Sequence, residues 1–355
     1  MTKTEINWSD ISKKFSKKEL PDSEVEFEGE VPADVVALYK DEALAHIASE
    51  LELPGFRKGH VPTDIALKKV GDIALLEESV EVLIRELYPA LVAEHAADAV
   101  GRPDIRITKL APSEPVGLTV RTAVYPVVTI PKDWKDIAGK TPLEAAALAT
   151  DEEVEKTIED LRKSRRAPSA PDAEGALQEA PLPELNDEFA QSLGAFKTLE
   201  ELRTQIKKGI GEEKERTAKD ARRGKIIDKL LDKTQVAVPK IFVESELDKI
   251  MGQMQEDVAR FGMSYEDYLK RVNKTEEAVR QDFYEQGAKR AKLQLVLNKL
   301  AADEKIDAEK EAVDAEMKHA VEHFPEANLE LLKIHIETVL RNERVLKILE
   351  GEAKE

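Results

Sequence analysis

The spacing of hydrophobic residues changes along this chain, and the change limits the folds that are open to it. Residues 24–31 alternate, with Val25, Phe27 and Val31 separated by glutamates, which predicts a strand with one buried face. Helical spacing follows to about residue 51 and again over 63–70 and 72–99, and alternation returns around Ile105 and over 118–124. This order predicts a small α+β domain in which helices cover an antiparallel sheet.

The chain after Pro142 is almost entirely helical in its spacing. Thr150 and Thr198 each precede a glutamate by three residues, the capping-box pattern that starts a helix. We expect Pro239 to start a later helix and Asn273 to cap a very long one that reaches about residue 302. Two last helices are expected over about 307–324 and 326–349, and a bend is expected at Pro89.

The resulting prediction is an α+β domain followed by an extended all-α domain. Residues 167–183 are rich in Pro and Ala and have no periodicity, so they are expected to form a linker without strands. The predicted parts are the α+β domain at 1–148, a linker helix at 149–166, the Pro/Ala-rich linker at 167–183 and the helical domain at 184–355.

The composition excludes several classes of function. Of the 355 residues 35% are charged, and the net charge of −18 argues against extensive direct binding to nucleic acid. The chain has no cysteine, which excludes disulfides and thiolate metal sites. We find no signal peptide and no apolar run long enough for a membrane span, so a cytoplasmic protein is expected.

The loop at residues 54–62 is the most informative motif. Two glycines permit sharp turns and two prolines stiffen its ends, while an aromatic ring and two cations lie between them without any acid. Such a loop can dock on a partner, although it can equally be a plain helix connection with Phe56 folded onto its own core. The candidate docking residues are Gly55, Phe56, Arg57, Lys58, Gly59 and Pro62.

A second candidate is a group of methionine and aromatic residues after Pro239. Methionine adapts to irregular partners and therefore suits a surface that binds many chains, while ordinary helix packing is the alternative interpretation. The candidate substrate-binding residues are Met251, Met254, Phe261, Met263, Tyr265, Phe283 and Leu295.

Enzyme signals are weak in this sequence. His319 and His323 have metal-ligand spacing but no catalytic carboxylate between them, and surface histidines are the simpler interpretation. There is no nucleotide-binding GxxxxGK[ST] motif. We therefore expect no catalytic residue, no metal and no cofactor.

The run GFRKGHVP at residues 55–62 matches the GFRxGxxP signature of the trigger factor family of ribosome-associated chaperones. The resemblance also covers residues 24–126, the segment PELNDEF at 183–189 and the segments around Thr198 and Val238. It implies a ribosome-binding N-terminal domain, a two-armed helical domain for substrate, and Arg57 as an ion-pair donor. The implied partners are the large-subunit protein beside the exit tunnel and nascent polypeptides, and a homodimer off the ribosome is left open.

One departure from the family pattern affects the expected activity. Most members carry a prolyl isomerase of the FK506-binding type, of about one hundred residues, where this chain has only the span from Lys163 to Pro183. We therefore expect an ATP-independent chaperone without isomerase activity. The alternatives are a prolyl isomerase as in the wider family, a helical adaptor that grips one folded partner, and a periplasmic chaperone, which the missing signal peptide argues against.

Overall fold

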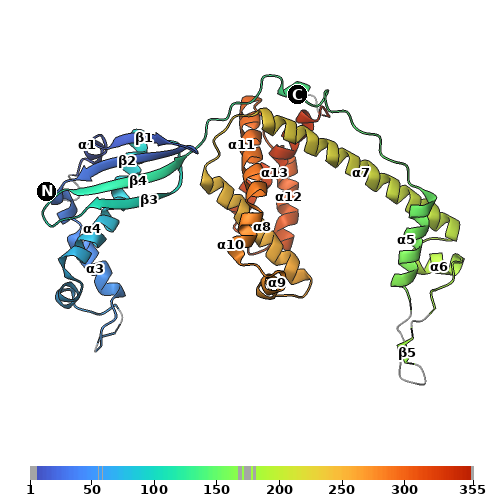
Figure 1. The fold of residues 1–355 in the computed structure, drawn as a ribbon, viewed down its shortest axis with the longest axis horizontal. Coiled ribbons are helices and arrows are strands. Elements are labelled where there is room, and N and C mark those ends of the chain that lie inside the picture. Colours follow the sequence, from blue (N-terminus) through green and yellow to red (C-terminus); the bar gives the residue numbers. More distant parts are fainter. Residues whose placement is uncertain are drawn as a thin grey trace. The chain divides into compact units, whose positions relative to one another are not determined.

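The computed structural model describes residues 6–352 apart from 55, 58, 167–169, 172–176 and 179–180. Figure 1 shows the helices and strands of this part of the chain. It divides into two compact units. Unit 1 comprises the chain up to Thr129 together with Gln235–Lys299, and unit 2 comprises Ile130–Thr234 together with the chain from Leu300 onward. Neither unit is one continuous stretch, because a segment of the expected all-α domain belongs to unit 1.

The elements of unit 1 are a sheet and helices from both of its segments. Its strands are β1 (Ser16–Leu20), β2 (Glu24–Val31), β3 (Ala99–Lys109) and β4 (Val116–Val124), in the spatial order β1-β2-β4-β3 with antiparallel neighbours. Its helices are α1 (Trp8–Ser12), α2 (Ala33–Ala37), α3 (Lys40–Glu50), α4 (Thr63–His95), α8 (Lys240–Arg260), α9 (Tyr265–Val272), α10 (Glu276–Asp282) and most of α11 (Tyr284–Asp303).

The predicted strand at 24–31 is present with the predicted bounds. Its buried side chains are Val25, Phe27 and Val31, and the glutamates between them are not buried. Gly29 has a packing reason, because a Cβ atom there would lie 2.6 Å from the ring of Phe15. The ring therefore covers the strand at a point where no side chain stands.

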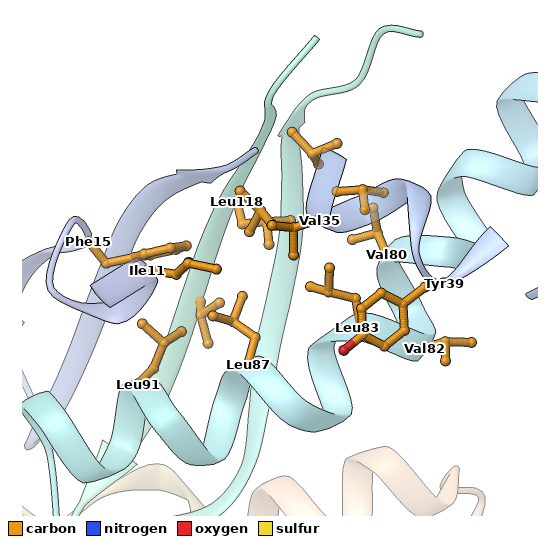
Figure 2. Packing of buried hydrophobic residues seen from close by; sticks show 14 of the residues in the cluster. Ile11, Phe15, Val35, Tyr39, Val80, Val82, Leu83, Leu87, Leu91 and Leu118 are labelled. Atoms are coloured by element: carbon orange, nitrogen blue, oxygen red, sulfur yellow. The ribbon is translucent and has the colours of Figure 1, made fainter. Parts of the chain in front are cut away.

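Helix α4 supplies the apolar face that covers this sheet. Leu83, Leu87 and Leu91 recur at helical spacing, are fully buried and point toward the sheet, where Leu118 of β4 lies (Figure 2). Tyr39 packs at the edge of the same core, and its hydroxyl donates to the Glu86 carboxylate at 2.7 Å. The predicted α+β domain with helices against an antiparallel sheet is thus confirmed.

The break in α4 lies at Gly71, between the two helices predicted at 63–70 and 72–99. Gly71 has φ 81° and ψ 171°, a backbone conformation that favours glycine, and it is the residue with non-helical angles inside this helix. The bend expected at Pro89, within the second of these helices, stays a prediction. The chain changes direction where glycine permits it, and Pro89 is accommodated inside the helix.

The elements of unit 2 are mostly helices. Among the described residues they are the 3₁₀ turn η2 (Trp134–Asp136), the helices α5 (Asp151–Ser164), α6 (Asp187–Leu193), α7 (Leu199–Lys233), α12 (Lys310–His323) and α13 (Leu329–Leu349), and the short strands β5 (Ala170–Pro171) and β6 (Leu177–Gln178). The antiparallel pairing of β5 with β6 corrects the expectation of a linker without strands. Two-residue strands are too short to produce a periodic pattern.

The capping signals predicted for unit 2 are in place. At α5 the Thr150 hydroxyl accepts from the Glu153 amide, and the Glu153 carboxylate accepts from the Thr150 amide at 2.9 Å, which completes a capping box. At α7 the Thr198 hydroxyl likewise accepts from Glu201, whose own carboxylate accepts from the Lys197 amide at 2.7 Å. Local sequence therefore determines where both helices begin.

The prediction for Asn273 was wrong. Asn273 has φ 53° and ends α9 in a left-handed conformation, and Thr275 is the residue that caps the next helix. The single long helix expected to residue 302 is accordingly α10 and α11, which meet at Phe283. Asparagine suits both helix ends, so the sequence alone did not distinguish them.

Candidate functional site

The predicted docking loop joins α3 to α4 in unit 1. Two local hydrogen bonds shape its described part, from the Phe56 amide to the Leu53 carbonyl at 3.1 Å and from the His60 amide to the Arg57 carbonyl at 3.0 Å. Gly59 has φ 78°, so the second turn needs the left-handed region that glycine supplies. Gly55 and Lys58 lie outside the described residues.

A small core of its own supports this loop. Val61 and Ala66, just after the loop, are buried together with Ala48 of α3, and neighbouring leucines of α3 and the loop pack around them. Pro62 starts α4, with its carbonyl accepting from the amides of residues 65 and 66 at 3.0 Å. Leu44 and Ile47 of α3 pack against both this cluster and the core under the sheet.

The tip of the loop projects its apolar and cationic groups. Phe56 is 40% exposed and is not among the buried or half-buried residues of the small core. Arg57 is exposed, and no carboxylate of the described residues lies within 4.0 Å of its guanidinium. An exposed ring beside an exposed guanidinium can pair with an apolar pocket bordered by an acid.

A groove in the second segment of unit 1 contains part of the other predicted site. It has a volume of about 660 Å³ and lies among α8, the turn that follows it, α9, Phe283 and α11. Its lining is mainly apolar with a few polar groups: Ile250, Gln253, Met254, Asp257, Val258, Phe261, Met263, Tyr268, Arg271, Phe283 and Arg290.

The turn after α8 shapes the end of this groove. Gly262, at φ 73°, follows the last helical turn, and its amide donates to the Ala259 carbonyl at 2.9 Å. The Met263 amide donates to the Val258 carbonyl at 3.3 Å, which completes the paired hydrogen bonds of a Schellman motif. This reversal brings Met263 back to the lining while Phe261 stays 88% exposed.

An ion-pair bridge links α10 to α8, the helix that lines much of the groove. Arg280 of α10 donates to Glu244 at 2.7 Å and to Asp248 at 2.8 Å, both on α8. The hydrogen bond to Glu244, followed by that to Asp248, raises the pKa of the Arg280 guanidinium. Because the two carboxylates lie one helical turn apart, the bridge fixes α10 along α8 rather than at a single point.

The structure separates the seven candidate substrate-binding residues into three groups. Met254, Phe261, Met263 and Phe283 line the groove. Met251 and Leu295 are 3% and 2% exposed, so they pack in the helical interior, the alternative that the sequence left open. Tyr265 stacks on Tyr268 with ring centroids 6.2 Å apart, and burial raises the pKa of its phenol.

Sequence reasoning missed several residues that line the groove, among them two apolar residues of α8 and two arginines. Ile250 and Val258 flank Met254 at helical spacing, a signal that was available from the pattern i, i+4, i+8. Arg271 and Arg290 lie on different helices and have no common sequence pattern, so their convergence is a result of the tertiary fold.

The histidine pair of α12 and the long helices bear on metal binding and on membrane insertion. The rings of His319 and His323 lie edge to face with centroids 4.7 Å apart, and the described part of the chain brings no group of three potential metal ligands together. None of the helices in this part combines the length and apolar character that a membrane span requires.

Comparison with known proteins identifies the family. A family model described as "Bacterial trigger factor protein (TF)" matches residues 13–161, and one described as "Bacterial trigger factor protein (TF) C-terminus" matches residues 198–350. The two matches together span well over half of the chain, and they leave residues 162–197 unmatched between them.

Individual relatives agree with the two models. The trigger factor of Agathobacter rectalis is 24% identical over 81% of this chain and 82% of its own length, and that of Bacillus subtilis is 23% identical over 83% and 88%. A solved structure described as "Promiscuous Substrate Recognition in Folding and Assembly Activities of the Trigger Factor Chaperone" covers 96% of this chain and 100% of its own, with a TM-score of 0.52 and 20% identity. This chain belongs to the trigger factor family.

Proposed function

We propose that the chain is an ATP-independent, cytoplasmic chaperone that docks on the ribosome and holds nascent polypeptides. The observation that carries the proposal is the exposed Phe56–Arg57 tip on its own small core, within the signature that the family shares. An anchored tip loses little conformational freedom when it docks, so its ring and guanidinium can contribute to affinity. The expected partner is the large-subunit protein beside the exit tunnel.

The apolar groove supports the second half of the proposal. Met254, Met263 and Phe283 present polarisable and aromatic surface, and flexible methionine side chains fit many partners. Each buried methylene contributes only about 0.8 kcal/mol, so clients can bind through many weak contacts and leave without ATP. We infer that unfolded segments with apolar side chains are the ligands of this groove.

The segment between α5 and α6 supports the absence of an isomerase. Arg162 donates to the Pro183 carbonyl at 2.8 Å, so the two ends of residues 163–182 are held together. A prolyl-isomerase domain needs on the order of one hundred residues, and neither family model matches this segment. A protease-coupled assay on a prolyl peptide should give no rate above background, and a catalysed rate would favour the isomerase alternative.

Ribosome co-sedimentation tests the docking proposal. We expect the wild-type protein to pellet with bacterial ribosomes, and Phe56→Ala/Arg57→Ala/Lys58→Ala to stay in solution. The matched control is Ile65→Ala/Lys68→Ala/Lys69→Ala, which removes one exposed apolar and two cationic side chains from the helix just after the loop. If the control is lost from the pellet as readily as the loop variant, the loop is not the docking element.

Aggregation suppression separates a chaperone from an adaptor. A chaperone should slow the aggregation of several unrelated unfolded proteins, whereas an adaptor that grips one folded partner should not. Protection of none of them would contradict the proposed holding function.

A further inference from the structure

An extended segment of unit 2 lies along the long helix α7. Residues 142–150 precede α5 and adopt neither helix nor strand. We call residues 141–150 the strap, and Figure 1 shows it running beside α7. Nothing in its sequence, TPLEAAALAT, predicts such a placement, because its apolar residues have no consistent period.

Cations of α7 hold the main chain of the strap. Arg222 donates through Nε to the Thr141 carbonyl at 2.8 Å, and Lys214 donates to the Leu148 carbonyl at 3.1 Å. Lys229 donates to the Thr141 hydroxyl at 2.8 Å and to the Lys140 carbonyl at 3.2 Å. Main-chain carbonyls are common to every polypeptide, so this arrangement recognises extended backbone rather than one particular side chain.

Carboxylates complete the match between strap and helix. Lys225 pairs with Glu144 of the strap. Lys207 pairs at 2.7 Å with Asp151, which directly follows the strap. Lys207, Lys214, Arg222 and Lys229 stand seven or eight residues apart, about two helical turns, and therefore form one row along α7. The row favours an extended chain that carries acidic groups.

The strap fills the α7 face incompletely. Cavities of about 480 and 490 Å³ lie beside it, and both are lined by Ala146 and Ala147 together with small residues of α7 such as Gly211 and Ala218. Leu143 and Leu148 are 50% and 88% exposed, so apolar burial contributes little to holding the strap. Larger side chains than the alanines of the strap fit this face.

We propose that the α7 face is a second site for extended polypeptide, which the strap occupies until a client segment displaces it. The ligand class is an unfolded segment with a carboxylate near small or medium apolar residues, held mainly through its carbonyls. This proposal rests on the proposed chaperone function and adds a substrate class and a second site to it. A tethered strap competes at high effective concentration, so weakening it exposes the site.

Peptide binding to the full chain tests the proposal. The probe is a fluorescently labelled peptide with the sequence of residues 140–151, followed by anisotropy. Glu144→Lys replaces the ion pair with Lys225 by repulsion and leaves α7 unchanged, so it should tighten peptide binding at least threefold. The control Glu152→Lys makes the same charge change on α5 outside both cavities and should leave the affinity at the wild-type value.

A second set of variants tests whether the peptide binds on α7. Added to Glu144→Lys, Ala218→Phe should fill the cavity and remove the gain, and Lys214→Ala, which removes one carbonyl donor without adding bulk, should reduce it. A permanently unfolded client protein should displace the labelled peptide. Equal affinity of the folded Glu144→Lys and wild-type proteins, or binding that survives both α7 variants, would overturn the proposal.

The outcomes separate this inference from the proposed function. If the client fails to displace the peptide while ribosome pelleting and aggregation suppression persist, the α7 site is wrong and the chaperone proposal stands. If the peptide binds as expected but pelleting and suppression are both absent, the α7 face binds polypeptide and the proposed function fails.

Discussion

Met251 and Met254 lie less than one turn apart on α8, yet only Met254 borders the groove. Met251 faces the helical interior and is almost inaccessible to solvent, so its side chain packs in the core. At this scale, exposure separates residues that the sequence grouped together. Phe261 is the extreme case, since a large aromatic side chain stands almost fully in solvent beside the groove.

This contrast predicts opposite effects of two substitutions. Met251→Ala should lower the free energy of unfolding by about 2–3 kcal/mol, because it leaves a cavity in a packed core. Phe261→Ala should change it by less than about 0.5 kcal/mol and weaken aggregation suppression. Denaturant titration and a client aggregation assay check the pair. Equal destabilisation by both would mean that Phe261 is also a packing residue.

Helix boundaries follow local chemistry at the scale of the element, as the capping box of α5 shows. The Glu153 carboxylate accepts from Lys214 at 2.7 Å and from the Thr150 amide, and these hydrogen bonds lower its pKa to about 2. A carboxyl with a lowered pKa in the folded state stabilises the fold when it is ionised. That contribution is fully present above its ordinary pKa of 4.5 and is lost as pH falls through about 2.

The pH dependence of one variant tests this assignment. At pH 6, Glu153→Gln should have a lower melting temperature than the wild-type protein, and the difference should shrink steadily between about pH 4.5 and 2. Glu152→Gln, on the same helical turn, is the control. A difference that stays constant over this range would show that the charge of Glu153 does not act through Lys214 and the cap.

The break in α4 offers a second test at this scale. Gly71→Ala should lower the free energy of unfolding by about 1 kcal/mol, because alanine at a positive φ is strained even in open space. Gly209→Ala, inside α7 with open space around it, should instead stabilise by about 0.5–1 kcal/mol. The two unfolding curves should therefore shift in opposite directions. A stabilising Gly71→Ala would mean that the break can straighten.

At the scale of the whole molecule, each unit is assembled from segments far apart in the sequence. In unit 2, Arg223 of α7 donates to Glu343 at 3.0 Å and to Glu350 at 3.2 Å. Both glutamates lie more than 100 residues after Arg223 in the sequence. The Glu350 carboxylate, more than that of Glu343, raises the pKa of the guanidinium. Glu350 is buried, so its carboxylate needs the guanidinium as a hydrogen-bonding partner in place of water.

Removing the Arg223 cation alone should therefore reduce the stability of the protein more than removing both members of the ion pair. Arg223→Met should lower the stability of the protein by about 2 kcal/mol, since it leaves a buried carboxylate without its guanidinium. Arg223→Met/Glu350→Met should recover at least half of the loss. Thermal and denaturant unfolding of the two variants measure this. No recovery in the double variant would show that the arginine acts through packing and not charge.

Much of the fold follows from patterns that lie within about ten residues. The alternation at 24–31, the glycine break at 71, the capping box at Thr150 and the loop signature at 55–62 are each visible in the sequence, because strand faces, helix starts and turns depend on neighbouring residues. Strand β1 escaped notice because it is a charged edge strand, with an exposed SKKE run where apolar alternation would be expected.

The sequence by itself determined the helix-rich class, most element boundaries, the loop signature at 55–62 and the short span between α5 and α6. Only the tertiary structure decided which methionines are buried, which arginines converge on the groove, and which segments build each compact unit. It also placed the strap on α7, where lysines and an arginine meet its carbonyls. Exposure and convergence depend on contacts between residues distant in the chain, and local periodicity carries no record of those contacts.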